Sequence, residues 1–247
     1  EMVEKYILLI VVIVVAVVIL LAKFLKYVGK KNKAGEIKTG KRTLWEEFLY
    51  GFHVIMHPFD GFWDLKHEKR GSVRGAVCIV LFTILSVVYQ MIGSAYLFGG
   101  GRKIDLFIPI ITVLGPLFLW CIANWCLTTL FDGEGSFKDI FIATSYALLP
   151  IPLIGIPSTI CTNFLSLAEA EFITLFLAIS YIWAGMLIFF GSMTTHGYSM
   201  GRNIVITFFT IVGMIFILFI ILLFTNLIQQ MVSFITNLMT EISYRAQ

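Results

Sequence analysis

The chain has 247 residues, of which 59% are hydrophobic and 13% are charged, and its formal net charge is +3 at pH 7. Its mean hydropathy of +0.92 lies far above the range of soluble globular proteins. These values exclude a soluble globular domain and indicate an integral membrane protein.

Six apolar runs are long enough to cross a membrane, because a spanning helix needs roughly 20 mainly apolar residues. The first extends from Tyr6 to Ala22, and five more lie at residues 75–98, 104–131, 137–165, 172–193 and 203–228. Short loops join the last five. The runs predict an all-α integral membrane protein, a five-helix transmembrane bundle preceded by one additional N-terminal transmembrane helix.

This pattern divides the chain into five parts. They are an N-terminal transmembrane anchor (1–28), a basic linker (29–43), an interfacial segment (44–74), the five-span bundle (75–228) and an amphipathic tail (229–247). In the tail, Ile228, Met231, Ile235, Leu238, Met239 and Ile242 share one helical face. The tail can lie on the membrane surface, extend the last span or dock on a partner, and the pattern does not choose between these placements.

Basic residues predict the orientation. Twelve of the 18 Lys and Arg residues lie between the first two runs, which makes that region cytoplasmic. Alternation then places the N-terminus and the tail outside a multi-pass protein of the cell membrane, although Arg102 and Lys103 count against this assignment. The linker charges are a topology signal or, alternatively, contact anionic lipids at about 1 kcal/mol per basic residue.

The N-terminus lacks the features of a signal peptide. Glu1, Glu4 and Lys5 precede the first run in place of a basic region, and no small-residue cleavage site follows it. We therefore expect that residue 1 is not the start of the gene product and that a translocated domain lies upstream.

The segment "LWEEFLYGFHVIMHPFDGFWDLKH" (44–67) predicts two short helices on the membrane surface. Pro58 ends the first, because proline lacks a backbone donor and restricts the residue before it. In the first helix we expect Glu46 and Glu47 to face away from the apolar side. The expected apolar residues are Trp45, Phe48, Leu49 and Phe52 in the first helix and Phe59, Phe62, Trp63 and Leu65 in the second.

His53 and His57, with Asp60 and Asp64, suggest a metal site, but Pro58 breaks the helix that would align the two imidazoles. Metal binding is therefore the minor hypothesis. All four cysteines fall inside apolar runs, and neither a zinc spacing, a serine nucleophile elbow nor a phosphate-binding loop is present. We expect no catalytic residue, no metal and no cofactor. Gly197 and Gly201, beside His196, have the spacing for close helix approach, which at a span end is weak evidence.

The third bundle span carries the most informative pattern. Ser136 and Asp139 have the spacing of a capping box, which starts a helix. Pro150, Pro152 and Pro157 then remove three backbone donors, which frees the carbonyls of Tyr146, Leu148 and Leu153. We expect neighbouring polar side chains to bond these carbonyls; the candidates are Thr144, Ser145, Asn163 and Asn124. The result is either a kinked structural helix or a broken helix that lines a substrate path.

These features resemble the Yip family, the Ypt/Rab-interacting membrane proteins and their bacterial relatives. The similarity covers about residues 44–230 and rests on "HPFDGFWDL" and on "WCIANWCLTTLF" followed by "DGEGSFKDIFIATSYALLP". It singles out Pro58 and Trp63, then Asn124, Gly133, Gly135, Ser136, Tyr146 and Pro150. The resemblance implies a five-helix bundle without a cofactor or catalytic centre. The additional N-terminal helix departs from the trafficking members and argues against Rab binding; the composition suggests a bacterial-type member.

The sequence therefore predicts a non-enzymatic scaffold or accessory subunit of a membrane assembly, which tethers an extracytoplasmic N-terminal domain. The alternative is a lipid- or solute-translocating protein, or a permease subunit, that uses the proline-broken helix. Expected partners are the lipid bilayer and other membrane or exoplasmic proteins, and no nucleic acid is expected.

Overall fold

The computed structural model describes residues 23–24, 26–30, 43–94, 105–128, 130–164 and 170–245. Within these ranges the chain contains helices and no strand, and five helical segments are long and apolar enough to cross a membrane. The segments are Val73–Gly93, Phe107–Thr128, Phe137–Thr162, Glu171–His196 and Met200–Ile242. The five bundle spans are thus confirmed. The first apolar run, most of the basic linker and the expected domain upstream fall outside the described residues.

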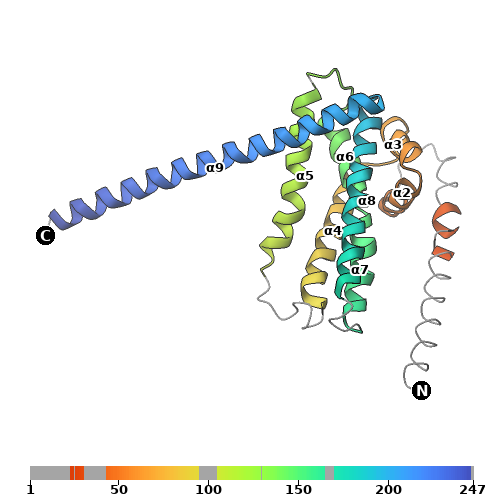
Figure 1. Cartoon of the computed structure of the whole chain (residues 1–247), viewed down its shortest axis with the longest axis horizontal. Helices are drawn as coiled ribbons and strands as arrows, with labels where there is room; N and C mark the ends of the chain where they lie inside the picture. The colour runs from red at the N-terminus through yellow and green to blue at the C-terminus, as the bar shows by residue number, and fades with distance from the viewer. Residues whose placement is uncertain are drawn as a thin grey trace.

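Two short helices pack against the side of the bundle near one of its ends, which we call the cap end (Figure 1). Helix α2 (Leu44–Met56) begins at a capping box in which Thr43 and Glu46 each bond the other's backbone N–H. It ends before His57, and Pro58 starts α3 (Pro58–His67), which confirms the break predicted at this proline.

The cap helices pack into the protein core and do not simply lie on its surface. Leu49, Phe62 and Leu65 are buried with Ile79 and Tyr146 in the main hydrophobic cluster, whereas Trp45 and Phe59 are exposed. The expectation that Glu47 faces away from this core is wrong, because its side chain is buried and accepts a hydrogen bond from Ser72, which precedes the helix that begins at Val73. Burial of apolar area is the main force that holds the cap on the bundle.

The spans α4 (Val73–Gly93), α5 (Phe107–Thr128) and α8 (Ala170–His196) run alongside the third span (Figure 1). Helix α4 is capped by Ser72, whose hydroxyl accepts the Gly75 N–H at 3.2 Å. The third span consists of α6 (Phe137–Ala147) and α7 (Pro150–Thr162) and is the most buried of the five. Ser136 and Asp139 form the capping box that starts α6.

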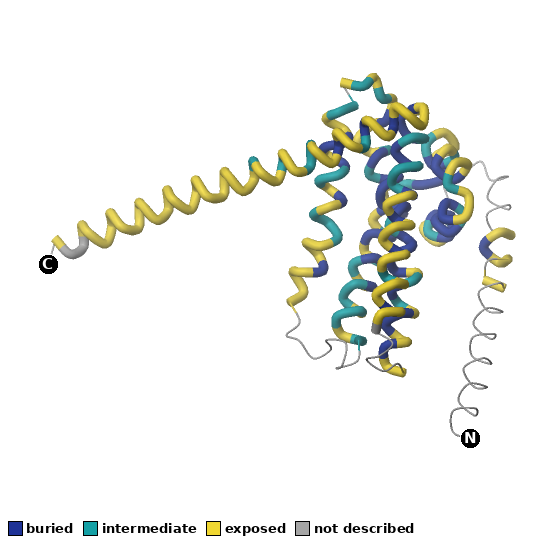
Figure 2. Tube along the Cα trace, in the orientation of Figure 1, coloured by how far each residue is buried: buried dark blue, intermediate teal, exposed yellow. Residues whose placement is uncertain are grey.

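Helix α9 (Met200–Arg245) is a single element of 46 residues. It packs on α5 near the cap end and then leaves the bundle, so that most of its length is exposed (Figures 1 and 2). At a rise of about 1.5 Å per residue it is roughly 69 Å long, about twice the thickness of the hydrocarbon core. The helix continues without interruption past residue 228, so the tail extends the last span.

Candidate functional site

A buried polar network at the cap end joins three segments that are distant in the chain. His196, at the end of α8, lies with Nε2 2.7 Å from Asn124 Oδ1, and the Asn124 amide donates to Ser192 Oγ at 3.3 Å. The backbone N–H of Gly135 donates to His196 Nδ1 at 3.3 Å. Because a backbone N–H can only donate, Nδ1 is the acceptor, and the neutral imidazole carries its proton on Nε2. His196 therefore connects α5, α8 and the turn before α6.

The glycines of this turn permit the close approach. A Cβ on Gly133 would lie 2.2 Å from the Tyr198 hydroxyl and 2.6 Å from His196 Nδ1. A Cβ on Gly135 would lie 2.8 Å from His196 Cε1. Both positions thus exclude a side chain while His196 and Tyr198 keep their places. The structure brings Asn124, Gly133, Gly135 and Ser136, singled out from the sequence, to one region around His196.

Charged residues tie the same turn to its neighbours. Lys66 Nζ on α3 lies 3.0 Å from Glu134 Oε2, and this contact lowers the pKa of the exposed Glu134 carboxyl. Arg202, in the first turn of α9, bonds the Phe131 carbonyl and lies over the ring of Tyr198. Burial raises the pKa of the Tyr198 phenol. The turn is therefore linked to α3 on one side and to α9 on the other.

A second buried polar group joins the cap to the bundle. The Tyr146 hydroxyl, fully buried on α6, donates to the Glu47 carbonyl on α2 at 3.0 Å. The Ser72 hydroxyl donates to Glu47 Oε2, and Gly75 leaves room for both, since a Cβ there would lie 2.7 Å from the Tyr146 hydroxyl. Tyr146, predicted from the family resemblance, thus sits at the joint between α2, α4 and α6.

A third group holds α2 against α3. The Tyr50 hydroxyl donates to Asp64 Oδ2 at 2.6 Å, and the Arg70 guanidinium lies over the Tyr50 ring and 3.6 Å from the same carboxylate oxygen. Burial, followed by the hydrogen bond to Asp64, raises the pKa of the Tyr50 phenol above its usual range. Trp63 points outward from this group, half exposed and stacked on His67.

The histidines proposed as metal ligands do lie together. The His53 and His57 rings stack with centroids 5.0 Å apart, even though the helix ends between them. Asp64, however, is held by Tyr50 and Arg70. Within the described ranges no group of three or more His, Cys, Asp or Glu side chains is placed to hold a metal ion.

At the proline break in the third span, the carbonyls of Tyr146 and Leu148 accept hydrogen bonds from the chain's own backbone. Leu149 N donates to the Tyr146 carbonyl at 3.3 Å and Ile151 N to the Leu148 carbonyl at 3.0 Å, so the chain tightens to i to i+3 bonds there. The expectation that polar side chains bond these carbonyls is wrong. Thr144 and Ser145 bond carbonyls of the preceding turn, Asn163 bonds those of Gly93 and Thr159, and Asn124 belongs to the His196 network.

The predicted prolines differ in their surroundings. Pro150 and Pro152 are buried in the first turn of α7, whereas Pro157 is exposed inside the same helix. Gly197 and Gly201 do not make the close helix contact that their spacing suggested. Gly197 has a φ of +69° and forms the turn between α8 and α9, and open space surrounds Gly201.

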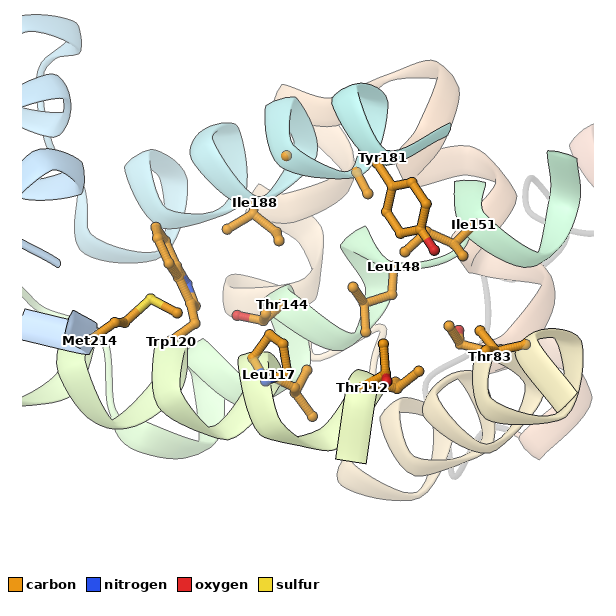
Figure 3. Close-up of a pocket in the computed structure, with 15 residues that line it drawn as sticks. Thr83, Thr112, Leu117, Trp120, Thr144, Leu148, Ile151, Tyr181, Ile188 and Met214 are labelled. Carbon is orange, nitrogen blue, oxygen red and sulfur yellow. The ribbon is translucent and has the colours of Figure 1, made fainter. Parts of the chain in front are cut away.

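A cavity of about 490 Å³ lies next to this break (Figure 3). Its floor is formed by Thr83 of α4 and by Thr144, Leu148 and Ile151 of the third span. Its walls are formed by residues of α5, including Leu117 and Trp120, and of α8, including Tyr181 and Ile188. The lining is almost entirely apolar.

Sequence reasoning missed two central residues, His196 and Glu47. In the sequence, His196 is a loop histidine beside two glycines, and Glu47 lies on the polar side of a surface helix. The signal for His196 was the pair of glycines at positions 133 and 135, since closely spaced glycines mark a near approach of backbone to another group. Nothing in the sequence alone indicated which group that was.

These observations define a class, the polytopic all-helical membrane proteins with a capped bundle. The family model described as the Yip1 domain matches residues 52–229. The chain belongs to the Yip family. No match was found among curated proteins or among solved structures.

Proposed function

We propose that this protein is a non-enzymatic scaffold or accessory subunit of a membrane assembly, and that α9 is the element that contacts its partner. The observation that carries the proposal is the length and exposure of α9, which extends far beyond the bundle that anchors it. A helix of this kind has little internal role, because most of its residues touch no other part of the described structure.

The distal half of α9 has two chemically different faces. Asn226, Gln230, Ser233 and Asn237 follow one another at intervals of four, three and four residues, which places them on one face. Met231, Ile235 and Ile242 lie on the opposite face. Amide and hydroxyl side chains aligned on one exposed helical face can donate hydrogen bonds to a partner and accept them from it, each worth about 0.5–1.5 kcal/mol. The polar stripe, defined by these four residues, is the contact surface that we propose.

The polar groups at the cap end support a structural role over a catalytic one. Both ring nitrogens of His196 are engaged by backbone or side-chain partners, and the Tyr50 and Tyr146 hydroxyls each donate to a fixed acceptor. These groups hold helices together, so the bundle serves as a rigid anchor for the exposed helix.

The test introduces a photo-crosslinking amino acid at Ser233 in the natural host and follows it with purification in mild detergent. The proposal expects a stoichiometric adduct with another membrane or exoplasmic protein. The same amino acid at Ile235, one helical face away, is the matched control and should give little adduct. Recovery of uncrosslinked monomer from both positions would contradict the scaffold role.

A second candidate function is translocation of a lipid or solute, as a transporter or permease subunit. The cavity beside the break between α6 and α7 favours it, because interrupted helices line transport paths in many carriers. Reconstituted vesicles with a lipid-flip or flux assay separate the two functions. A scaffold shows no flux, and Pro150→Ala then changes only folding, whereas a carrier loses flux in this variant.

The proposed placement is the cell membrane with the cap in the cytoplasm. Lys66, Lys69 and Arg74 at the cap support it through the preference of basic loops for that side. The N-terminus and the end of α9 then lie outside, and the five-part division and the tethered N-terminal domain fit this arrangement. A single cysteine at Gln229 in a cysteine-free variant should react with a membrane-impermeant thiol reagent on intact cells, and one at Lys69 should not.

A further inference from the structure

We propose that the cavity between α5 and α8, called here the α5–α8 cavity, binds the acyl chain of a membrane phospholipid. This inference does not depend on the scaffold role, since a lipid chain can occupy the bundle of either a scaffold or a carrier. The ligand class is a lipid acyl chain, and the support comes from the depth, the shape and the lining of the cavity.

The depth of the cavity places it within the hydrocarbon layer. Tyr181 and Ile188 lie about 15 and 26 Å along the helix axis from Glu171, where the fourth span begins, at a rise of about 1.5 Å per residue. Both distances fall within a hydrocarbon core of about 30 Å. A side opening at this depth therefore meets lipid tails.

The cavity has such a side opening. Helix α5 packs on α6 and α9, and α8 packs on α6 and α7, but α5 and α8 make almost no contact with each other in the described structure. Tyr181 at the wall is 53% exposed, whereas Leu117 and Ala184 deeper in the cavity are each 3% exposed. The cavity thus opens laterally beside Tyr181. Figure 3 shows the Tyr181 ring pointing toward Leu148 and Ile151 of the third span.

The lining selects a hydrocarbon chain over a polar solute. No charged residue lines the cavity within the described residues. The hydroxyls of its three threonines, Thr83, Thr112 and Thr144, donate to the carbonyls of Ile79, Ile108 and Ile140 at 2.9, 2.7 and 2.7 Å. Their protons are therefore used within their own helices and are not offered to a ligand.

Size and hydration agree with this ligand. A volume of about 490 Å³ lies within the range of about 300–1,000 Å³ that is usual for ligand sites. Water is retained in a cavity only where it finds two or more polar partners, and this lining supplies few. An acyl chain from the surrounding bilayer fills the space with apolar contacts instead.

Two glycines provide a matched pair of variants. Gly185 lines the cavity and has open space where a Cβ would stand, so Gly185→Phe fills the cavity without striking a neighbour at Cβ. Gly115 on α5 also has open space at its Cβ position but does not line the cavity. Gly115→Phe therefore adds the same ring to a membrane span and leaves the volume of the cavity unchanged.

The experiment reconstitutes the full chain in vesicles of phosphatidylcholine and phosphatidylglycerol that contain a phosphatidylcholine with a diazirine at the middle of one acyl chain. After illumination, labelled residues are located by peptide mass spectrometry. We expect label at Leu117 and Ala184 well above that at Leu187, with Ile215, which is 63% exposed on α9, as the lipid-facing reference. Leu187, 2% exposed and not part of the lining, should remain unlabelled.

Gly185→Phe should lower the labelling of Leu117 and Ala184 several-fold, while Gly115→Phe should leave it unchanged. The proposal is overturned if the wild-type protein carries label at Ile215 but not at Ala184. It is equally overturned if both phenylalanine variants, or neither, reduce the label at Ala184. Even if Gly185→Phe fails to fold, the amount of label at Ala184 relative to Leu187 in the wild-type protein shows whether a lipid chain enters the cavity.

Discussion

His196 Nε2 and Asn124 Oδ1, in residues separated by 72 positions in the chain, lie 2.7 Å apart in a buried hydrogen bond. One partner ends α8 and the other lies on α5, and these two helices make almost no other contact. The bond and its continuation to Ser192 therefore couple the two helices at the cap end, above the lateral opening of the α5–α8 cavity.

A double-mutant cycle on Asn124→Ala and His196→Ala should reveal this coupling. Each single change leaves a buried polar partner unsatisfied, which costs about 1–3 kcal/mol of unfolding free energy. The double variant should be more stable than the sum of the single changes predicts, by about 0.6–2 kcal/mol. Denaturant unfolding in detergent micelles measures these free energies.

Asn163→Ala is the control for this cycle. Its amide bonds the Gly93 carbonyl at the opposite end of the bundle, at 3.1 Å, so it shares no partner with His196. Its effect should add to that of His196→Ala within about 0.5 kcal/mol. Additivity in the Asn124 cycle would contradict the network.

His196→Ala should restore stability to different extents in the Gly133→Ala and Gly135→Ala variants. Gly135→Ala places a Cβ 2.8 Å from His196 Cε1 and 2.9 Å from Thr195 Cγ2, and His196→Ala removes the first contact, so the second change should restore part of the lost stability. Gly133→Ala also meets the Tyr198 hydroxyl, and His196→Ala alone should rescue it less. Overpacking of this kind costs about 1–3 kcal/mol. Gly201→Ala, which meets open space, is the control; equal rescue of both glycine variants would contradict the geometry.

Tyr146→Phe tests the joint between the cap and the bundle. The ring stays buried, but the hydrogen bond to the Glu47 carbonyl is lost, which should lower the unfolding free energy by about 0.5–1.5 kcal/mol. A cysteine introduced at the buried Leu49 should then react faster with a thiol reagent, because α2 separates more often from α6. Tyr89→Phe, at an exposed position on α4, should change neither quantity.

The sequence predicted the parts of the fold that depend on local chemistry. Five apolar runs became five spans, Ser136 with Asp139 became a helix cap, and Pro58 became a helix break. Each of these follows from residues within a few positions of one another, so composition and spacing suffice.

The missed features depend on contacts between distant segments. The His196 network joins positions 124, 135 and 196. The buried Glu47 carboxylate accepts a hydrogen bond from Ser72, 25 positions later in the chain. The error over the freed carbonyls has another cause. A helix break can relax to i to i+3 bonds within its own backbone, so polar side chains nearby remain available for other partners.

The cap should lose stability as the pH falls, and His53 should account for part of this loss. Burial first, and the neighbouring His57 second, lower the pKa of His53 below its usual value of about 6.5. Below about pH 6.5 the unfolded chain binds a proton at this position that the folded chain does not, so folding stability falls with pH until the lower folded pKa is reached.

His53→Phe keeps a stacked ring but cannot titrate, so its unfolding free energy should fall less between pH 7.5 and pH 5.5 than that of the wild-type protein. His57→Ala should reduce the pH dependence only in part, because burial is the larger cause of the shift. Unfolding curves of the three proteins across this pH interval make the comparison, and identical slopes for His53→Phe and the wild-type protein would contradict the assignment.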